Sequence, residues 1–437
     1  MGCAAVAALP GGSSAQVGRG NTENARAAKF FHVEQRNGKW WMIDPAGKPF
    51  QMRGCNHYGT GGAQWRDAVR DRHRDWGFTY LPPSVGGVDH GTGGAAARTR
   101  GVSTSPEWPA EDFAALDYPF AAFLAGGMKR SGAGGRDPFN FQALKSADMP
   151  DVFGTEFAEA LDRRCREFVA PLRENRQLIG YHFCHNPPWN MDAPAAEEWI
   201  TACTQPGSAG LKEWTRLMQC LYGSIERWRE TYGIPIKQWS DIEQLSQPLN
   251  GYVSKPRARL DREAFLVRIC EQWHRMYHDA IRKYDPNHLI LGDRNTLHLQ
   301  PAPAPWAFHI MRRFLDVLSV NVMGPPRTVY GVLEAATRHW DGPILLADTG
   351  AAIYTGEPPK QGYQARDLAE WEEVYGGMMR MSVEHPQIIG FGWCAWYEMP
   401  RGRVGIVDSV TDAPIADRVA IVKKWNAWMA ERLPALQ

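Results

Sequence analysis

The stretch that decides the fold is LIGYHFCHNPPWNMD, residues 178–192. It begins with apolar, small and aromatic residues, which is typical of a buried strand. It then enters a loop that holds His185, Asn186, two prolines and Trp189. A buried strand followed by a polar loop is typical of parallel α/β proteins, whose functional groups follow the carboxyl ends of the strands.

Similar apolar stretches recur along the chain and alternate with segments of helical spacing. The other strands are expected at residues 50–56, 77–84, 118–127, 288–293, 316–324, 343–350 and 388–398. Helices are expected at residues 155–169, with Thr155 as N-cap, and at 261–284 and 415–432. Eight strands separated by helices predict an α/β protein with a (β/α)8 TIM barrel. The alternative is an open doubly wound sheet, but the glycine-rich phosphate turn that its usual ligands require is missing after the early strands.

Three segments lie outside this alternation. Residues 30–54 carry the turn signals RNGK and DPAGKP between short apolar runs, which predicts a small N-terminal antiparallel β cap. Residues 186–256 predict a long insertion after strand 4. Residues 1–28 are rich in Gly, Ser and Ala and read as a disordered or signal-like tail, which leaves 29–437 as a single catalytic domain.

Composition excludes several classes of partner. Lys and Arg total 49 against 48 Asp and Glu, so no basic footprint for nucleic acid is present. No segment reaches the ~18 apolar residues of a membrane span. The 8 cysteines form no C-x-x-C pair, which argues against a zinc knuckle and favours buried thiols. The short apolar run near the start is compatible with a secreted or periplasmic protein, and a cytoplasmic location and the oligomeric state stay open.

Polar and aromatic side chains follow most of the predicted strands. They are Arg53, Asn56 and His57; His182, His185 and Asn186; Asp293 and Arg294; Asn321; Asp348 and Thr349; Trp393, Trp396 and Glu398, while the insertion adds Trp189, Asp192, Asp241 and Glu243. Carboxylates and amides suit sugar hydroxyls, and flat aromatic faces suit sugar rings. The 18 tryptophans fit such a site, although core packing accounts for most of them.

In the order and spacing of its strands and of the polar residues that follow them, the chain resembles the barrel glycoside hydrolases of the large retaining clan. Within this clan it resembles the β-agarase-type enzymes. The matching segments are GKWWMIDPAGKPFQMRGCNH (38–57), LIGYHFCHNPPW (178–189), YDPNHLILGDRN (284–295), DVLSVNVM (316–323), PILLADTG (343–350), and IIGFGWCAWYE (388–398) with GIVDSVTDAP (405–414). They run from about residue 30 to the C-terminus in the family's order.

The resemblance also shows where this chain departs from the family. The family's fourth strand ends in Asn-Glu, and that Glu is the acid/base; here Asn186 matches the Asn, and Pro187 stands in the place of the Glu. Asp348 stands at the position of the nucleophilic Glu on strand seven. Arg53 and Asn56 match sugar-binding residues of the first strand, and Trp393 matches the aromatic residue of strand eight. The resemblance therefore implies hydrolysis of a polysaccharide or oligosaccharide, such as an algal galactan, by a non-standard catalytic pair.

We accordingly expect Asp348, His185 and Glu243 to be the catalytic residues. The expected substrate-binding residues are Arg53, Asn56, His57, Asn186, Trp189, Asp293, Asn321, Trp393 and Glu398. His57, His185, Asp293 and Asp348 offer the ligand types of a metal site, but strand one has no H-x-H pair, so we expect no metal and no cofactor.

Two other functions stay open at this point. The site could eliminate across a uronic acid, with His185 as base and with Asn186 and Arg53 neutralising the carboxylate. It could also bind glycans without turnover, because one catalytic group is missing, and Asp348 would then be a structural partner of Arg53 or Arg294. A second carboxylate within about 10 Å of Asp348 would favour hydrolysis, whereas convergence of only His, Asn and Arg would favour elimination or binding.

Overall fold

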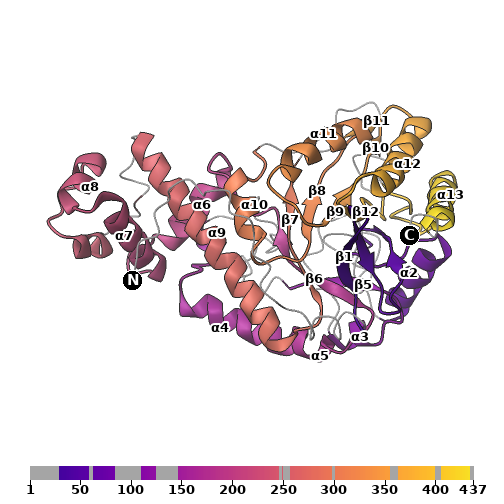
Figure 1. The fold of residues 1–437 in the computed structure, drawn as a ribbon, viewed down its shortest axis with the longest axis horizontal. Helices are drawn as coiled ribbons and strands as arrows, with labels where there is room; N and C mark the ends of the chain where they lie inside the picture. Colours follow the sequence, from indigo (N-terminus) through magenta and orange to yellow (C-terminus); the bar gives the residue numbers. More distant parts are fainter. Residues whose placement is uncertain are drawn as a thin grey trace.

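Parallel strands form the centre of the molecule (Figure 1). The computed structural model describes residues 29–58, 63–83, 110–124, 146–245, 249, 256–297, 301–354, 363–398 and 405–433, so the predicted tail at 1–28 lies outside the described residues. The curled seven-stranded sheet has the order β4-β12-β9-β8-β7-β6-β5. Its strands are β4 (Met52–Cys55), β5 (Phe120–Phe123), β6 (Leu178–His185), β7 (Leu289–Thr296), β8 (Leu318–Asn321), β9 (Ile344–Thr349) and β12 (Ile388–Trp393). Each coincides with a predicted strand.

Residues 78–83 lie between the two edges of this sheet. The Thr79 amide donates to the Arg53 carbonyl of β4 over 2.7 Å. On the other side, the Leu81 amide donates to Pro119 over 2.8 Å, and Ala121 of β5 donates to Leu81 over 3.0 Å. The predicted strand 77–84 is therefore present in position, and it links the edge strands of an α/β barrel.

Alternation along the strands gives the barrel an apolar interior. A buried cluster inside it contains Met52, Tyr80, Ala121, Ile179, Leu289, Leu291, Val317, Leu345, Ala347 and Ile389. Phe31 and Met42 of the N-terminal segment join the same cluster. Met42 belongs to a three-stranded antiparallel sheet of β1 (His32–Arg36), β2 (Lys39–Ile43) and β3 (Pro49–Phe50), and Phe31 directly precedes it; this sheet confirms the predicted cap.

Helices cover the outside of the sheet, and three of them test the predicted boundaries. The segment 155–169 forms α4 (Thr155–Arg164) and a π-helical turn, Cys165–Val169. Thr155 is the first helical residue and Gly154 the N-cap, so the predicted cap was wrong by one position. Helix α9 (Pro256–Tyr284) starts earlier than predicted, because proline at a helix start costs no hydrogen bond. The last helix, α13 (Ala416–Arg432), is confirmed.

The predicted insertion after β6 forms a helical lobe. It contains α6 (Pro194–Cys203), α7 (Ala209–Tyr222), α8 (Ile225–Tyr232) and a 3₁₀ turn, Trp239–Gln244. Figure 1 shows α7 and α8 at one end of the molecule, away from β9 and β12. No described helix is long and apolar enough to cross a membrane.

One buried carboxylate ties this lobe to α9. Asp261 is 1% exposed and accepts hydrogen bonds from the hydroxyls of Tyr222 (2.5 Å) and Tyr232 (2.9 Å). We predict that Asp261→Ala lowers the free energy of unfolding of the lobe by about 2–4 kcal/mol, because two buried hydroxyls lose their acceptor. Hydrogen exchange of the amides in α7 and α8 measures this loss.

The matched control is Asp192→Ala, which removes an exposed carboxylate that pairs with Arg259. An exposed pair contributes about 0–1 kcal/mol, so exchange in α7 and α8 should stay at the wild-type rate. Equal exchange rates in both variants would show that Asp261 does not anchor the lobe.

Candidate active site

Asp348 is the carboxylate at the centre of the candidate site. It lies at the end of β9, is 5% exposed, and has Arg294 Nη2 3.0 Å from its Oδ2. The side-chain amide of Asn56 donates to Oδ1 over 3.2 Å, and also to the Ala347 carbonyl over 2.9 Å. Strands β4, β7 and β9 thus fix this carboxylate in orientation.

Arg294 reaches Asp348 because β7 breaks its alternation. Leu289 and Leu291 point into the barrel, and Gly292 then takes a φ of +65°. This irregularity turns Asp293 outward and Arg294 inward, where Nε donates to Asn321 over 3.3 Å and Nη2 to the Ala347 carbonyl over 3.1 Å. The fully buried guanidinium places a permanent positive charge under the site.

The charge of Asp348 follows from these neighbours. Burial acts to raise the pKa of the Asp348 carboxyl, but the positive charge of Arg294 and the His57 ring outweigh it and hold this pKa well below its usual range. Asp348 is therefore a carboxylate at neutral pH and can act as an anion or a hydrogen-bond acceptor, but not as a proton donor.

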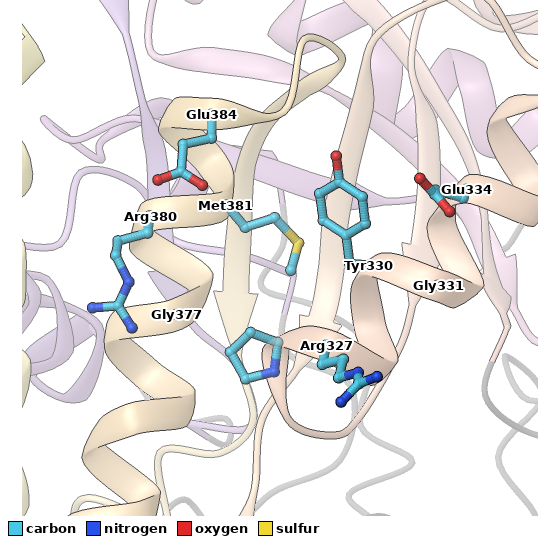
Figure 2. A pocket seen from close by; sticks show the side chains of 9 residues that line it. Arg327, Tyr330, Gly331, Glu334, Gly377, Arg380, Met381 and Glu384 are labelled. Carbon is cyan, nitrogen blue, oxygen red and sulfur yellow. The ribbon is translucent and has the colours of Figure 1, made fainter.

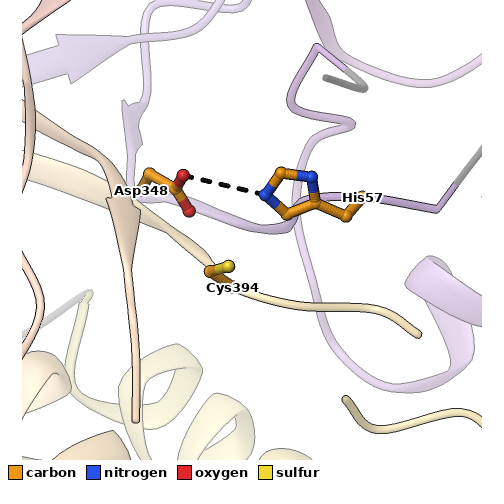
Figure 3. A group of neighbouring side chains, drawn as sticks. All are labelled: His57, Asp348 and Cys394. Atoms are coloured by element: carbon orange, nitrogen blue, oxygen red, sulfur yellow. Dashed lines mark ion pairs between the residues drawn. The ribbon is translucent and has the colours of Figure 1, made fainter. Parts of the chain in front are cut away.

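Two further groups converge on this carboxylate from neighbouring strand ends (Figure 3). His57 follows β4, and its Nε2 lies 3.7 Å from Asp348 Oδ2. Cys394 follows β12, and its Sγ lies within 4.8 Å of the nearest ligand atoms of His57 and Asp348. Burial and the negative charge of Asp348 raise the pKa of the Cys394 thiol well above its usual value.

His185 and Asn186 lie at the end of β6. The Asn321 amide nitrogen is 3.2 Å from His185 Nδ1, and the Thr296 hydroxyl donates to the Asn186 side chain. Burial and the charge of Arg294 lower the pKa of His185 to about 3, so its ring is neutral at neutral pH. At neutral pH the ring therefore holds no proton to donate as an imidazolium, and its low pKa makes it a weak proton acceptor.

Two non-glycine residues with positive φ lie at the same strand ends, while Asn37 and Asp412 lie in turns elsewhere. His57 and Asn186 have φ values of +63° and +55°. Residues with side chains rarely adopt this region, and such outliers cluster at functional sites. Of the predicted residues, the ends of these strands carry Asn56, His57, His185, Asn186, Asn321 and Asp348.

Three predicted binding residues lie elsewhere. Arg53 points opposite to Met52, and its Nη2 is 3.4 Å from the Gly77 carbonyl, outside the barrel interior. Trp189 is 1% exposed and packs on Trp199, so neither face is open to a sugar. Asp293 faces α9 because of the irregularity at Gly292.

The other predicted residues also turn away from Asp348. Trp393 is fully buried and packs on Trp371 and Tyr375 of α12 (Leu368–Glu384). Glu398 Oε1 pairs with Arg418 over 3.3 Å. Glu243 belongs to the 3₁₀ turn that packs on α7, in the insertion lobe. The predicted role of each residue depended on its place in the sequence, whereas packing decided where its side chain points.

Sequence reasoning left two residues out of the predicted site. Arg294 was expected only as one of two structural partners of Asp348 in the binding alternative, and the structure shows that Arg294, not Arg53, forms this ion pair. Cys394 was interpreted as a buried thiol. The signal that could have found it was its place in WCAW, immediately after the last strand of the barrel.

A separate groove lies between α11 (Pro326–Thr337) and α12 (Figure 2). It encloses about 420 Å³ and is lined from both helices by Tyr330, Glu334, Arg380, Met381 and Glu384, among others. All its lining residues belong to these helices, so the groove is not part of the strand-end site.

One buried histidine beneath the site makes the fold sensitive to pH. His73 of α2 (Ala63–Asp75) stacks on Trp396 at 4.6 Å, and burial lowers its pKa to about 4. The unfolded chain binds this proton at higher pH than the folded chain, so stability is complete above about pH 6.5 and falls as pH drops toward 4. We predict that His73 alone contributes a loss on the order of 3 kcal/mol.

Urea unfolding at pH about 7 and about 4.5 measures this term. His73→Gln should show a shallower loss between the two values than wild type, whereas His278→Gln, on the outer side of α9, should match wild type. An unchanged slope in His73→Gln would contradict the prediction.

Comparison with known proteins bears on the fold. No family model matches the chain, and no curated protein matches it in sequence. Among solved structures, an exo-β-agarase is similar with a TM-score of 0.68 at 17% identity, over 93% of this chain and 66% of that one. An agarase is similar with a TM-score of 0.66 at 17% identity, over 92% of this chain and 65% of that one.

A polyextremophilic β-galactosidase from the Antarctic haloarchaeon Halorubrum lacusprofundi has a TM-score of 0.58 at 11% identity, over 87% of this chain and 58% of that one. The chain thus spans two thirds or less of the length of these neighbours. At such identities the likeness shows a shared fold.

Proposed function

We propose that this chain is a carbohydrate-active enzyme of glycoside hydrolase type, with its sugar site at the strand ends around Asp348. The observation that carries the proposal is the buried Asp348 carboxylate, kept charged by Arg294 and surrounded by amides and imidazoles from neighbouring strands. Barrel enzymes carry their chemistry at this face, and such groups recognise sugar hydroxyls. The agarase-like fold supports an algal galactan or a related polysaccharide as substrate.

The finer fold assignment belongs to the same proposal. We take residues 78–83 to be the remaining strand of a (β/α)8 TIM barrel, because their backbone bonds to both edge strands. In such a barrel the ends of β4, β6, β7, β8, β9 and β12 face one common crevice.

The catalytic pair is non-standard in this proposal. Pro187 cannot transfer a proton, neutral His185 has none to give as an imidazolium, and Glu243 lies in the insertion lobe. Among the described residues, the side chains recorded in contact with Asp348 are Asn56, His57, Arg294 and Cys394. Asp348 thus supplies one carboxyl group, and retaining double displacement lacks its usual acid.

A second candidate is favoured by the same geometry, because amide, imidazole, guanidinium and thiol groups, and no second carboxylate, are recorded in contact with Asp348 among the described residues. Elimination across a uronic acid needs a neutral base and groups that neutralise the sugar carboxylate. His185 offers the base. Asn186 keeps its predicted role of neutralising the sugar carboxylate, and Asn321 with Arg294 takes the role predicted for Arg53. The base would take the proton from the carbon next to the carboxylate, the C–O bond to the neighbouring sugar would break, and the leaving oxygen would take a proton from water, so that an unsaturated sugar and a free hydroxyl form.

One assay series separates these functions. Wild-type protein is incubated with agarose, other algal galactans and uronate-containing polysaccharides. New reducing ends without unsaturated products indicate hydrolysis, ultraviolet absorbance of an unsaturated product indicates elimination, and retardation in glycan-containing gels without products indicates binding alone. We expect hydrolysis of a galactan. If the protein gives no products and shows no retardation on any glycan of the panel, the proposed function is refuted.

A further inference from the structure

His57, Asp348 and Cys394 form a compact set of three metal-ligand side chains. Each comes from a different strand end, and β4, β12 and β9 are neighbours in the sheet. The nearest nitrogen, oxygen and sulfur atoms all lie within 4.8 Å of one another, and His57 Nε2 lies 3.7 Å from Asp348 Oδ2 (Figure 3). We propose that these three residues bind one zinc ion, in contrast to the sequence-based expectation of no metal.

The distances fit a tetrahedral ion. Zinc binds imidazole, carboxylate and thiolate at about 2.0–2.3 Å, which puts two ligands about 3.5 Å apart. The 3.7 Å separation of His57 and Asp348 already matches this value. Cys394 needs a shift of up to about 1.3 Å, within the reach of a side-chain rotation.

The donor set selects the metal. One thiolate, one imidazole and one carboxylate suit zinc and similar transition metals, whereas Mg²⁺ and Ca²⁺ prefer oxygen ligands. Three protein ligands leave a fourth position for water or a substrate oxygen, as in catalytic zinc sites. His57 is partly exposed, which gives the ion an entry path.

The neighbouring groups orient the carboxylate ligand. The Asn56 amide holds Oδ1 and Arg294 holds Oδ2, which are the supporting contacts that metal-binding carboxylates usually have. Arg294 also repels a cation, and the thiol must release its proton on binding. We therefore expect micromolar rather than tighter affinity, on the order of 10⁻⁶ M.

The experiment is a zinc titration of the full chain, stripped with chelator, in the absence of sugar. We expect one equivalent of Zn²⁺, and binding at least about tenfold weaker in His57→Ala and Cys394→Ser. Cys220→Ser is the matched control, because Cys220 is an exposed cysteine on α7, and it should bind like wild type. Circular dichroism without metal verifies that the variants are folded.

Cobalt substitution gives a readout that does not depend on the variants. Co²⁺ bound to wild type should show a thiolate-to-cobalt charge-transfer band in the near ultraviolet. The site would be overturned if wild type takes up no zinc, or if His57→Ala and Cys394→Ser bind zinc as tightly as wild type. A cobalt complex without this band would also overturn it. The zinc site goes beyond the proposed function. Because the titration contains no glycan, a failure to bind zinc would leave the proposed function standing.

Discussion

Replacing Asp348 with asparagine should lower the turnover of the glycan substrate by at least about a thousandfold. The amide keeps the size of the side chain, but it removes the negative charge that lies beside Arg294 in the site. Without that charge the site can neither attack nor stabilise a developing positive charge at the sugar. Initial rates on the glycan selected by the panel measure the effect.

The control has to separate chemistry from folding, because Asp348→Asn leaves the Arg294 guanidinium buried without its counter-charge. Such a change can cost about 3–5 kcal/mol. Thermal unfolding must therefore show that Asp348→Asn is folded at the assay temperature. Asp192→Asn, which changes an exposed carboxylate of the insertion, should retain the wild-type rate. Asp348→Asn activity above about a tenth of wild type would refute a catalytic role of Asp348.

Replacing Asp293 with alanine should lower the free energy of unfolding by about 3–5 kcal/mol. The carboxylate is fully buried and accepts from the indole nitrogens of Trp189 and Trp273, each at 3.2 Å. His274 Nε2 lies 3.1 Å from it, and the Cys184 thiol also donates over 3.1 Å. Alanine leaves all four groups without their acceptor. Urea unfolding monitored by tryptophan fluorescence measures the loss.

Asp293→Asn distinguishes the structural role from the binding role predicted from sequence. Asparagine keeps one acceptor oxygen, so its loss of stability should be smaller than that of alanine. The Michaelis constant should stay near wild type, because Asp293 faces α9 rather than the site. A raised Michaelis constant with unchanged stability would instead place Asp293 at the substrate.

The sequence was sufficient to predict the parallel strands and the polar side chains that meet at their ends, because both depend on periodic local patterns. Parallel strands end at one edge, so polar residues after successive strands meet there whatever the helices do. That rule alone brought Asn56, His57, His185, Asn321 and Asp348 together.

The remaining assignments failed where local irregularities or distant packing decide direction. The positive φ of Gly292 exchanges the facing of Asp293 and Arg294, and no periodic pattern reveals it. The indole nitrogen of Trp189 donates to Asp293, which lies 104 residues away in the sequence, and this contact keeps the ring buried. Glu243 depended on the placement of a whole helical lobe, which long-range packing sets.

The most direct test of the sugar site is a crystal structure of Asp348→Asn bound to an oligosaccharide of the glycan selected by the panel. The account predicts a sugar ring at the ends of β4, β9 and β12, with hydroxyls within about 3 Å of Asn56, Asn321 or the substituted side chain. An oligosaccharide bound only elsewhere, for example in the groove between α11 and α12, would contradict it.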